Sequence, residues 1–164
     1  MSEVTLRIAR LDDVAAMVQL QRASWRMAYG SVLGEDLLEQ MDEGAHRRVW
    51  ERRLTETDPR PMLICHQERP VGLLYWQQEG EQAWLRAFYL DPDYWRQGLG
   101  LRLWQVVMVQ MRRAGCREAC LWLLGGNRIG AGFYFKHGFR PTGERRTLQT
   151  LGRDCVQHQL TRPL

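Results

Sequence analysis

The chain has 164 residues, a length typical of one domain with a sizeable hydrophobic core. Hydrophobic residues make up 45% of it, and the formal net charge is +4 at pH 7. The longest charge-free run of an expected helix, residues 103–111, is far too short to span a bilayer, which argues against a membrane protein. The N-terminal residues lack the basic and apolar regions of a secretory signal, so we expect one cytoplasmic domain over residues 1–164.

The distribution of charges and cysteines argues against two further classes of protein. The basic residues, all arginine except Lys136, are scattered along the chain, whereas a nucleic-acid interface needs a basic stripe with interleaved aromatic residues. The four cysteines show neither a CxxC pair nor zinc-ligand spacing, so we expect reduced structural thiols and no metal site. They are Cys65, Cys116, Cys120 and Cys155.

The first elements expected in chain order are a strand and a helix. Residues 5–9 alternate polar and apolar side chains, as a half-buried strand does. Asp12 and Asp13 can cap a helix that continues with an apolar stripe to about residue 29. Gly30 and Gly34 are expected to break this helix.

A second helical stretch and three strands are expected next. The helical stretch covers residues 35–41 and 44–54, and its inward side chains are Leu38, Met41, Trp50 and Leu54. Short apolar segments separated by turns at residues 67–70 and 79–81 predict strands at residues 62–66, 71–77 and 84–90.

The rest of the chain alternates helices and strands. Residues 98–114 have one apolar face and predict a helix on a sheet, and the apolar residues 118–124 predict a strand buried on both faces. A short helix over residues 128–137, closed by Gly138, leads to strands at 140–151 and 154–160. The order β-α-α-β-β-β-α-β-α-β-β predicts an α/β fold in which helices flank a mixed central sheet.

Two segments of the second half indicate a chemistry. In Trp95-Arg96-Gln97-Gly98-Leu99-Gly100, two glycines stand between a strand and a helix. A helix N-terminus attracts phosphate, and glycine lets the backbone approach an anion closely. The alternative is an ordinary strand-to-helix turn.

The second segment places Asn127, Gly130, Tyr134 and Gly138 on one face of the short helix. A phenol there could donate a proton to a leaving group. The alternative is a core tyrosine whose hydroxyl bonds to the backbone.

Together the two segments resemble the signature segments of the GNAT family of N-acetyltransferases, and the order of elements is similar over nearly the whole chain. The resemblance implies a mixed, mostly antiparallel sheet flanked by helices. It also implies an acyltransferase that moves an acetyl group from acetyl-CoA to a primary amine of a small molecule or peptide by direct attack. A non-catalytic CoA-binding regulatory module of the same fold is the alternative, and a homodimer is left open.

The resemblance also implies roles for individual residues. The family pattern Arg/Gln-x-x-Gly-x-Gly/Ala starts here with Trp95, so Arg96 is expected to supply the charge beside the backbone amides. The residues that would hold the pyrophosphate are Trp95, Arg96, Gln97, Gly98, Leu99, Gly100 and Leu101. A bulged, splayed strand would pair its backbone at Tyr89 and Leu90 with the pantetheine arm. Asn127 would contact that arm, and Tyr134 would protonate the departing thiolate.

The general base and the acceptor pocket stay open. Many family members carry an acidic residue early in the strand before the glycine loop, but here Trp84 occupies that place, with Arg86 on the same face. The remaining candidates for the base are Glu79, Glu81, Asp36, His66 or water. The aromatic and apolar residues that could line the acceptor pocket, or belong to the core instead, are Trp25, Met27, Tyr29 and Trp76.

Overall fold

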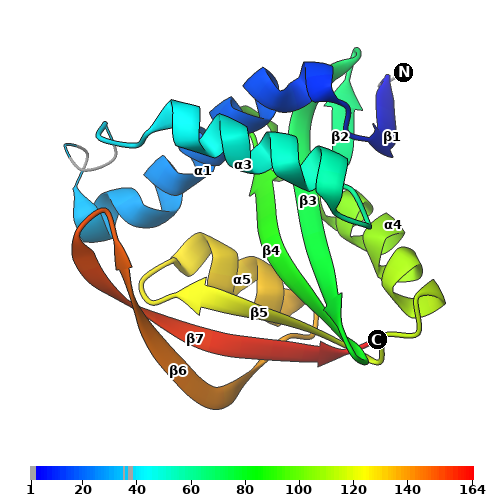
Figure 1. Cartoon of the computed structure of the whole chain (residues 1–164). Helices are drawn as coiled ribbons and strands as arrows, with labels where there is room; N and C mark the ends of the chain where they lie inside the picture. Colours follow the sequence, from blue (N-terminus) through cyan, green and yellow to red (C-terminus); the bar gives the residue numbers. More distant parts are fainter. Residues whose placement is uncertain (1–2, 35, 37–38) are drawn as a thin grey trace.

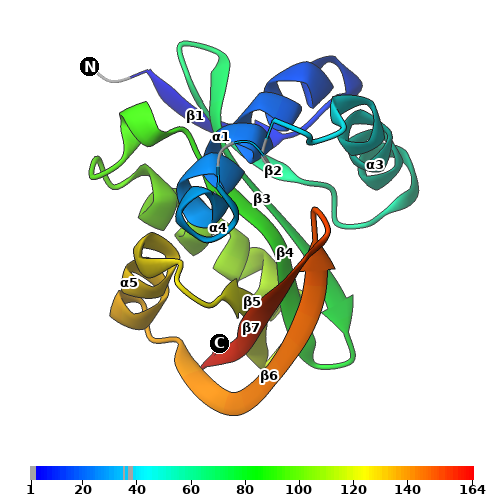
Figure 2. The same ribbon diagram turned by 90° about the vertical axis from the view of Figure 1, so that its left-hand side faces the viewer.

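The computed structural model describes residues 3–34, 36 and 39–164. They form a seven-stranded sheet in the order β1-β2-β3-β4-β5-β7-β6, in which every neighbouring pair is antiparallel except β4 and β5. Helices α1 and α3 pack on one face, and α4 and α5 pack on the other (Figures 1 and 2). The mixed, mostly antiparallel sheet flanked by helices is therefore confirmed.

The helices and strands have the following bounds, given in chain order. The strands are β1 (Val4–Ile8), β2 (Met62–His66), β3 (Arg69–Glu79), β4 (Gln82–Leu90), β5 (Glu118–Leu124), β6 (Arg140–Thr150) and β7 (Arg153–Pro163). The α-helices are α1 (Val14–Leu33), α3 (Glu43–Glu56), α4 (Leu99–Arg113) and α5 (Arg128–Lys136), and short 3-10 turns cover Leu11–Asp13 and Pro92–Tyr94. Of the helices that the structure describes, none is long and apolar enough to cross a membrane.

The expected ends of the first helix were partly wrong. Gly30 lies inside α1, and its carbonyl accepts the N–H of Gly34 at 3.1 Å. Gly34 ends the helix because its φ of 81° lies in the region that glycine adopts without steric cost. An interior glycine costs a helix only about 1 kcal/mol, which the packing of α1 on the sheet can offset.

Of the two expected helical segments, 44–54 corresponds to α3, whereas residues 39–42 are not helical and most of 35–38 is not described. Residues 35, 37 and 38, and with them the inward position of Leu38, lie outside the described residues. Helix α3 starts at Glu43, where the side chain of Asp42 accepts the N–H of Ala45 at 3.0 Å. This cap satisfies one of the N–H groups that the first turn leaves free, so α3 begins at Glu43.

The core has two main parts, one on each face of the sheet. On the α1–α3 face, Trp50 is fully buried and its indole N–H donates to Gln21 Oε1 at 2.8 Å. On the other face, Leu103, Trp104 and Met111 of α4 pack against β2 to β5. The four cysteines are buried free thiols, and burial raises the pKa of Cys120 to about 12.

Strands β4 and β5 share only part of their length. They are paired at Gln82–Trp84 and Glu118–Cys120, three residue pairs in all, and then diverge (Figure 1). A bulge at Arg86, where the register against β3 shifts, accompanies the bend of β4. Because β4 keeps β3 and β5 keeps β7 as its other neighbour, the facing backbone edges of residues 85–90 and 121–124 stay open toward each other.

Candidate active site

The divergence of β4 and β5 opens a cleft of about 880 Å³. The cleft is bounded by the second half of α1, the two strands, the loop before α4, and α5. The described residues that line it include Arg86, Arg96, Arg128, Lys136 and Arg146, but neither aspartate nor glutamate. The cleft is therefore a positively charged hollow with an aromatic and apolar lining.

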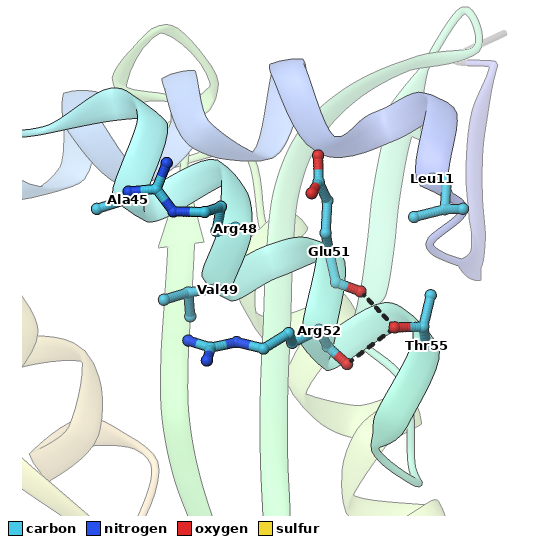
Figure 3. A pocket seen from close by; sticks show the side chains of 7 residues that line it. All are labelled: Leu11, Ala45, Arg48, Val49, Glu51, Arg52 and Thr55. Carbon is cyan, nitrogen blue, oxygen red and sulfur yellow. Dashed lines mark hydrogen bonds between the residues drawn. The ribbon is translucent and has the colours of Figure 1, made fainter.

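A second hollow lies on the outer surface of α3, away from the sheet (Figure 3). It is lined by Leu11 and by side chains of α3, among them Arg48, Glu51 and Arg52. The Thr55 hydroxyl there donates to the Glu51 carbonyl of its own helix at 2.9 Å. Neither the glycine loop nor Tyr134 belongs to this hollow, so the cleft between the strands is the candidate active site.

The glycine loop forms one end of the cleft. Gly98 is the N-cap of α4 with φ 77°, and a Cβ placed on it would meet nothing within 4 Å. The first-turn N–H groups of α4 have no partner within the helix, and they carry the positive end of its dipole. Gly100, two residues on, would place a Cβ 3.4 Å from the ring of Phe133 on α5. The loop is thus open in front of the helix and tightly packed behind Gly100.

Arg96 holds an uncommon backbone conformation in this loop. Its φ is 64°, a left-handed value that costs a residue with a side chain about 1 kcal/mol or more. Its side chain lines the cleft, as expected for a residue that supplies charge beside the glycines.

Trp95 connects the loop to the end of β4. Its indole N–H donates to the carbonyl of Leu90 at 3.1 Å. This bond explains how tryptophan fits a position where the family has arginine or glutamine, because the side chain fixes the loop and not an anion. The sequence alone did not reveal this contact, since it depends on the turn through Pro92–Tyr94.

Helix α5 forms the opposite wall. The Oδ1 atom of Asn127 accepts the N–H of Gly130 at 3.0 Å and so caps the helix, a role that the sequence analysis missed. A Cβ on Gly130 would lie 2.6 Å from Asn127 Nδ2 and 3.0 Å from Leu123 Cδ1, so a larger residue here would require the Asn127 amide and the Leu123 side chain to shift. The amide group of Asn127 remains beside the cleft with its Nδ2 donors.

Tyr134 lies in the middle of this wall. Its ring packs against Phe88, Phe133 and Phe139, with centroids 6.4, 5.6 and 5.3 Å away. Burial raises the pKa of Tyr134 far above its ordinary value, and Tyr89 adds to the effect. The raised pKa keeps this hydroxyl protonated at neutral pH. No hydrogen bond joins it to the described residues, so its proton is available to a group in the cleft.

The α1 side of the cleft is aromatic. The indole N–H of Trp25 donates to the hydroxyl of Tyr89 at 3.2 Å, and the rings of Trp25 and Tyr29 lie 5.1 Å apart. Burial is the main cause that raises the pKa of Tyr29 to about 12. Trp25, Met27 and Tyr29 all line the cleft, as expected of an acceptor pocket. Trp76 does not, because it is buried in the core on the α4 face, which is the second of the two alternatives left open for it.

The side chains considered as general bases lie outside the cleft. Glu79 pairs with Arg86 at 2.8 Å, and Glu81 lies 3.5 Å from Arg117 at the far end of β4. His66 Nδ1 contacts the Tyr94 hydroxyl at 3.1 Å, and Asp36 is exposed. None of the four is among the described residues that line the cleft, so the geometry leaves water as the candidate in contact with a bound amine.

Comparison with known proteins agrees with this geometry. Residues 14–139 match the model of the acetyltransferase (GNAT) family. The chain is 22% identical over 144 residues to a spermidine N(1)-acetyltransferase of Thermoplasma acidophilum, covering 84% of this chain and 88% of that protein.

Solved structures show the same fold. The PaiA N-acetyltransferase of Thermoplasma acidophilum, in complex with coenzyme A, superimposes with a TM-score of 0.78 at 20% identity, over 99% of both chains. A ribosomal-protein-alanine N-acetyltransferase from Brucella melitensis gives a TM-score of 0.73 at 16% identity, over 98% of this chain and 99% of that one.

Proposed function

Because the chain belongs to the GNAT acetyltransferase family, we propose that it is an N-acetyltransferase that moves the acetyl group of acetyl-CoA to a primary amine of a small molecule or peptide. The observation that supports this most directly is the position of Tyr134. Its protonated hydroxyl, unbonded to the described residues, lines the same cleft as the glycine loop. In this proposal residues 1–164 form one catalytic domain.

The residues present fit a CoA arm and its phosphates. The open backbone edges of residues 85–90 and 121–124 offer N–H and C=O groups to an extended, amide-bearing chain, and the groups of Leu90 are among them. The backbone groups of Tyr89 point to β3 instead, because they alternate with those of Leu90, and Asp91 donates to the Val71 carbonyl at 2.8 Å. Beyond Leu90, the first-turn amides of Leu99, Gly100 and Leu101 face an anion at the N-terminus of α4. Arg96 adds a guanidinium from the loop beside Gly98. Gln97, which was expected here too, is not among the described lining residues, and its side chain donates to the Asp93 carbonyl at 3.3 Å.

Different residues of this chain then have different roles in the reaction. Acetyl-CoA supplies an acetyl group activated as a thioester. Tyr134 donates its phenolic proton toward the sulfur as negative charge develops there, a contribution typically worth about 10²–10⁴-fold. Asn127 Nδ2 orients the amide-bearing arm beside it. The amine attacks directly in its neutral form, and its surplus proton passes to water, since the described lining contains no carboxylate.

The test is release of free CoA thiol from acetyl-CoA in a panel of amines, with mass spectrometry of the acetylated product. Turnover with any amine supports the proposal. Tight calorimetric binding of acetyl-CoA without turnover of any amine would instead favour the non-catalytic CoA-binding module. Absence of both binding and turnover would refute both assignments.

A further inference from the structure

Four side chains form a row across the sheet on the side of the cleft that faces α1, and we call it the tryptophan–arginine row. It comprises Arg86 and Trp84 of β4, Trp122 of β5 and Arg146 of β6. The guanidinium of Arg86 lies 5.4 Å from the Trp84 ring, and that of Arg146 lies 4.4 Å from the Trp122 ring. The two indoles stack with centroids 6.3 Å apart and an interplanar angle of 20°. The row thus presents a guanidinium at each end.

The positive charge of this row is incompletely balanced. Arg86 contacts Glu79, whose side chain is 58% exposed and lies outside the cleft. Arg146 donates to the neutral Gln157 Oε1 at 2.8 Å, and no ion pair joins it to the described residues. Burial first, and then the charge of Arg86, lowers the pKa of Arg146, as expected for two cations near one another.

A guanidinium in such surroundings is suited to an anion. Its planar fork donates two parallel hydrogen bonds to a carboxylate or phosphonate, and stacking on tryptophan fixes its orientation in advance. Arg86, Arg146 and Trp122 line the cleft, together with Tyr29 and Trp25 on the opposite side. A cationic acceptor such as a polyamine would meet two guanidiniums and, among the described lining residues, no carboxylate.

Resting on the proposed function, we propose that the acceptor amine carries an anionic group, a carboxylate or its phosphonate equivalent, that binds to the guanidinium of Arg146 beside Trp122. The amine of the same molecule then points along the cleft toward Tyr134. This assignment differs from the name of the spermidine-acetylating relative, which shares only 22% of its residues with this chain. Arg146 therefore acts as a specificity residue of the acetylation reaction, while Arg86, which donates to Gln77 and pairs with Glu79, adds positive charge to the lining.

The experiment compares acceptors that differ only in the anionic group. L-amino acids and aminoalkyl phosphonates are tested beside their carboxamides and beside spermidine, and kcat/KM is expressed per concentration of unprotonated amine. At least one anionic amine should exceed its own carboxamide about tenfold or more, because charged hydrogen bonds are worth that much. Turnover in which the carboxamides or spermidine equal or exceed every anionic amine would overturn the inference and leave the acetyltransferase assignment standing.

Two variants distinguish a local anion site from a general effect of positive charge on the protein. Arg146→Gln should raise KM for the preferred anionic amine about tenfold and leave the kinetics of its carboxamide unchanged. Arg145→Gln removes the same charge from the neighbouring position of β6, which does not line the cleft, and should leave both unchanged. Equal effects of the two variants would contradict a local anion site.

A binding measurement covers the case in which no amine is turned over. The amines are then titrated calorimetrically into the protein saturated with CoA. Binding of an anionic amine that weakens in Arg146→Gln, but not in Arg145→Gln, supports the anion site even though the proposed catalysis has failed. Absence of binding by every anionic amine overturns the site as well.

Discussion

Replacing Tyr134 by phenylalanine removes one hydroxyl from the wall of the cleft and keeps the ring that packs against Phe88, Phe133 and Phe139. If the hydroxyl protonates the leaving thiolate, kcat should fall by at least tens of fold, since general-acid catalysis is typically worth about 10²–10⁴-fold. Acetyl-CoA affinity should hardly change, because this interaction develops mainly in the transition state.

The structure also sets the expected effect on stability. The Tyr134 hydroxyl has no hydrogen bond to the described residues, so its loss leaves no buried partner unsatisfied among them. The change in unfolding free energy should stay within about 1 kcal/mol, or about 2–4 °C in Tm for a domain of this size. Because burial raises the pKa of Tyr134 above its ordinary 10.0, the phenol stays protonated at neutral pH, and its own titration should not reduce the wild-type rate below pH 10.

The assay is CoA-thiol release at saturating acetyl-CoA and amine, with calorimetric titration of acetyl-CoA and a melting curve for each protein. Tyr94→Phe is the matched control, since that hydroxyl contacts His66 and Arg69 and lies outside the described lining of the cleft. Its kcat should equal that of the wild type. A folded Tyr134→Phe protein with wild-type turnover would refute the acid role and leave a tyrosine that only packs.

Three further predictions concern the loop and the pH. Gly100→Val should weaken acetyl-CoA binding in calorimetry, because the added side chain meets the Phe133 ring; unchanged affinity would remove the loop from the site. Trp95→Arg removes the hydrogen bond to the Leu90 carbonyl, so the protein should lose about 1 kcal/mol of stability in denaturant titration. Its acetyl-CoA affinity should stay within a few-fold of the wild type; a large gain in affinity would show that tryptophan weakens binding. Burial is the largest of the causes that lower the pKa of His137 below 6.5 in the folded protein. The stability that neutral His137 contributes is therefore present above pH 6.5 and is lost as the pH falls through the pKa of the folded state. The Tm should therefore fall on acidification below pH 6.5, and less so in His137→Asn; equal slopes would contradict this.

Much of the fold was predictable because periodicity and turn residues are local signals. The bounds of β2 and β5 agree with the predicted ranges, since both strands are continuous apolar segments between turn residues. Gly30 misled the prediction because a glycine inside a packed helix has the same sequence signal as one at its end. For Trp76 the choice between pocket and core stayed open, because the sequence does not show whether an aromatic side chain faces a cleft or a core.

The chemistry of the site was predictable only in part. The glycines and Tyr134 are recognisable by their spacing, and the structure brings them to one cleft. The cap made by Asn127 is a local signal, an asparagine just before a helix, that could have been found from the sequence. The bond from Trp95 to Leu90 and the row that ends in Arg146 join residues through a backbone turn and strand pairing. Arg146 and Trp122, for example, lie on strands β6 and β5, which are separated by β7, so the side chain of Arg146 reaches Trp122 across β7. Such contacts depend on tertiary geometry, which a single sequence does not encode in its local pattern.

The short pairing of β4 with β5 also has a mechanical consequence. Strands β1–β4 and β5–β7 are two halves of a sheet whose backbones are joined by three residue pairs, so the seam between them has little resistance to opening. A ligand that hydrogen-bonds to both edges would take the place of a strand between β4 and β5. It would couple the two halves of the sheet, so that they unfold as one cooperative unit. Amide hydrogens of residues 85–90 and 121–124 that exchange readily in the free protein should then slow together when the seam is filled. At a ligand concentration of about 100 times Kd, the whole protein should gain about 2.7 kcal/mol.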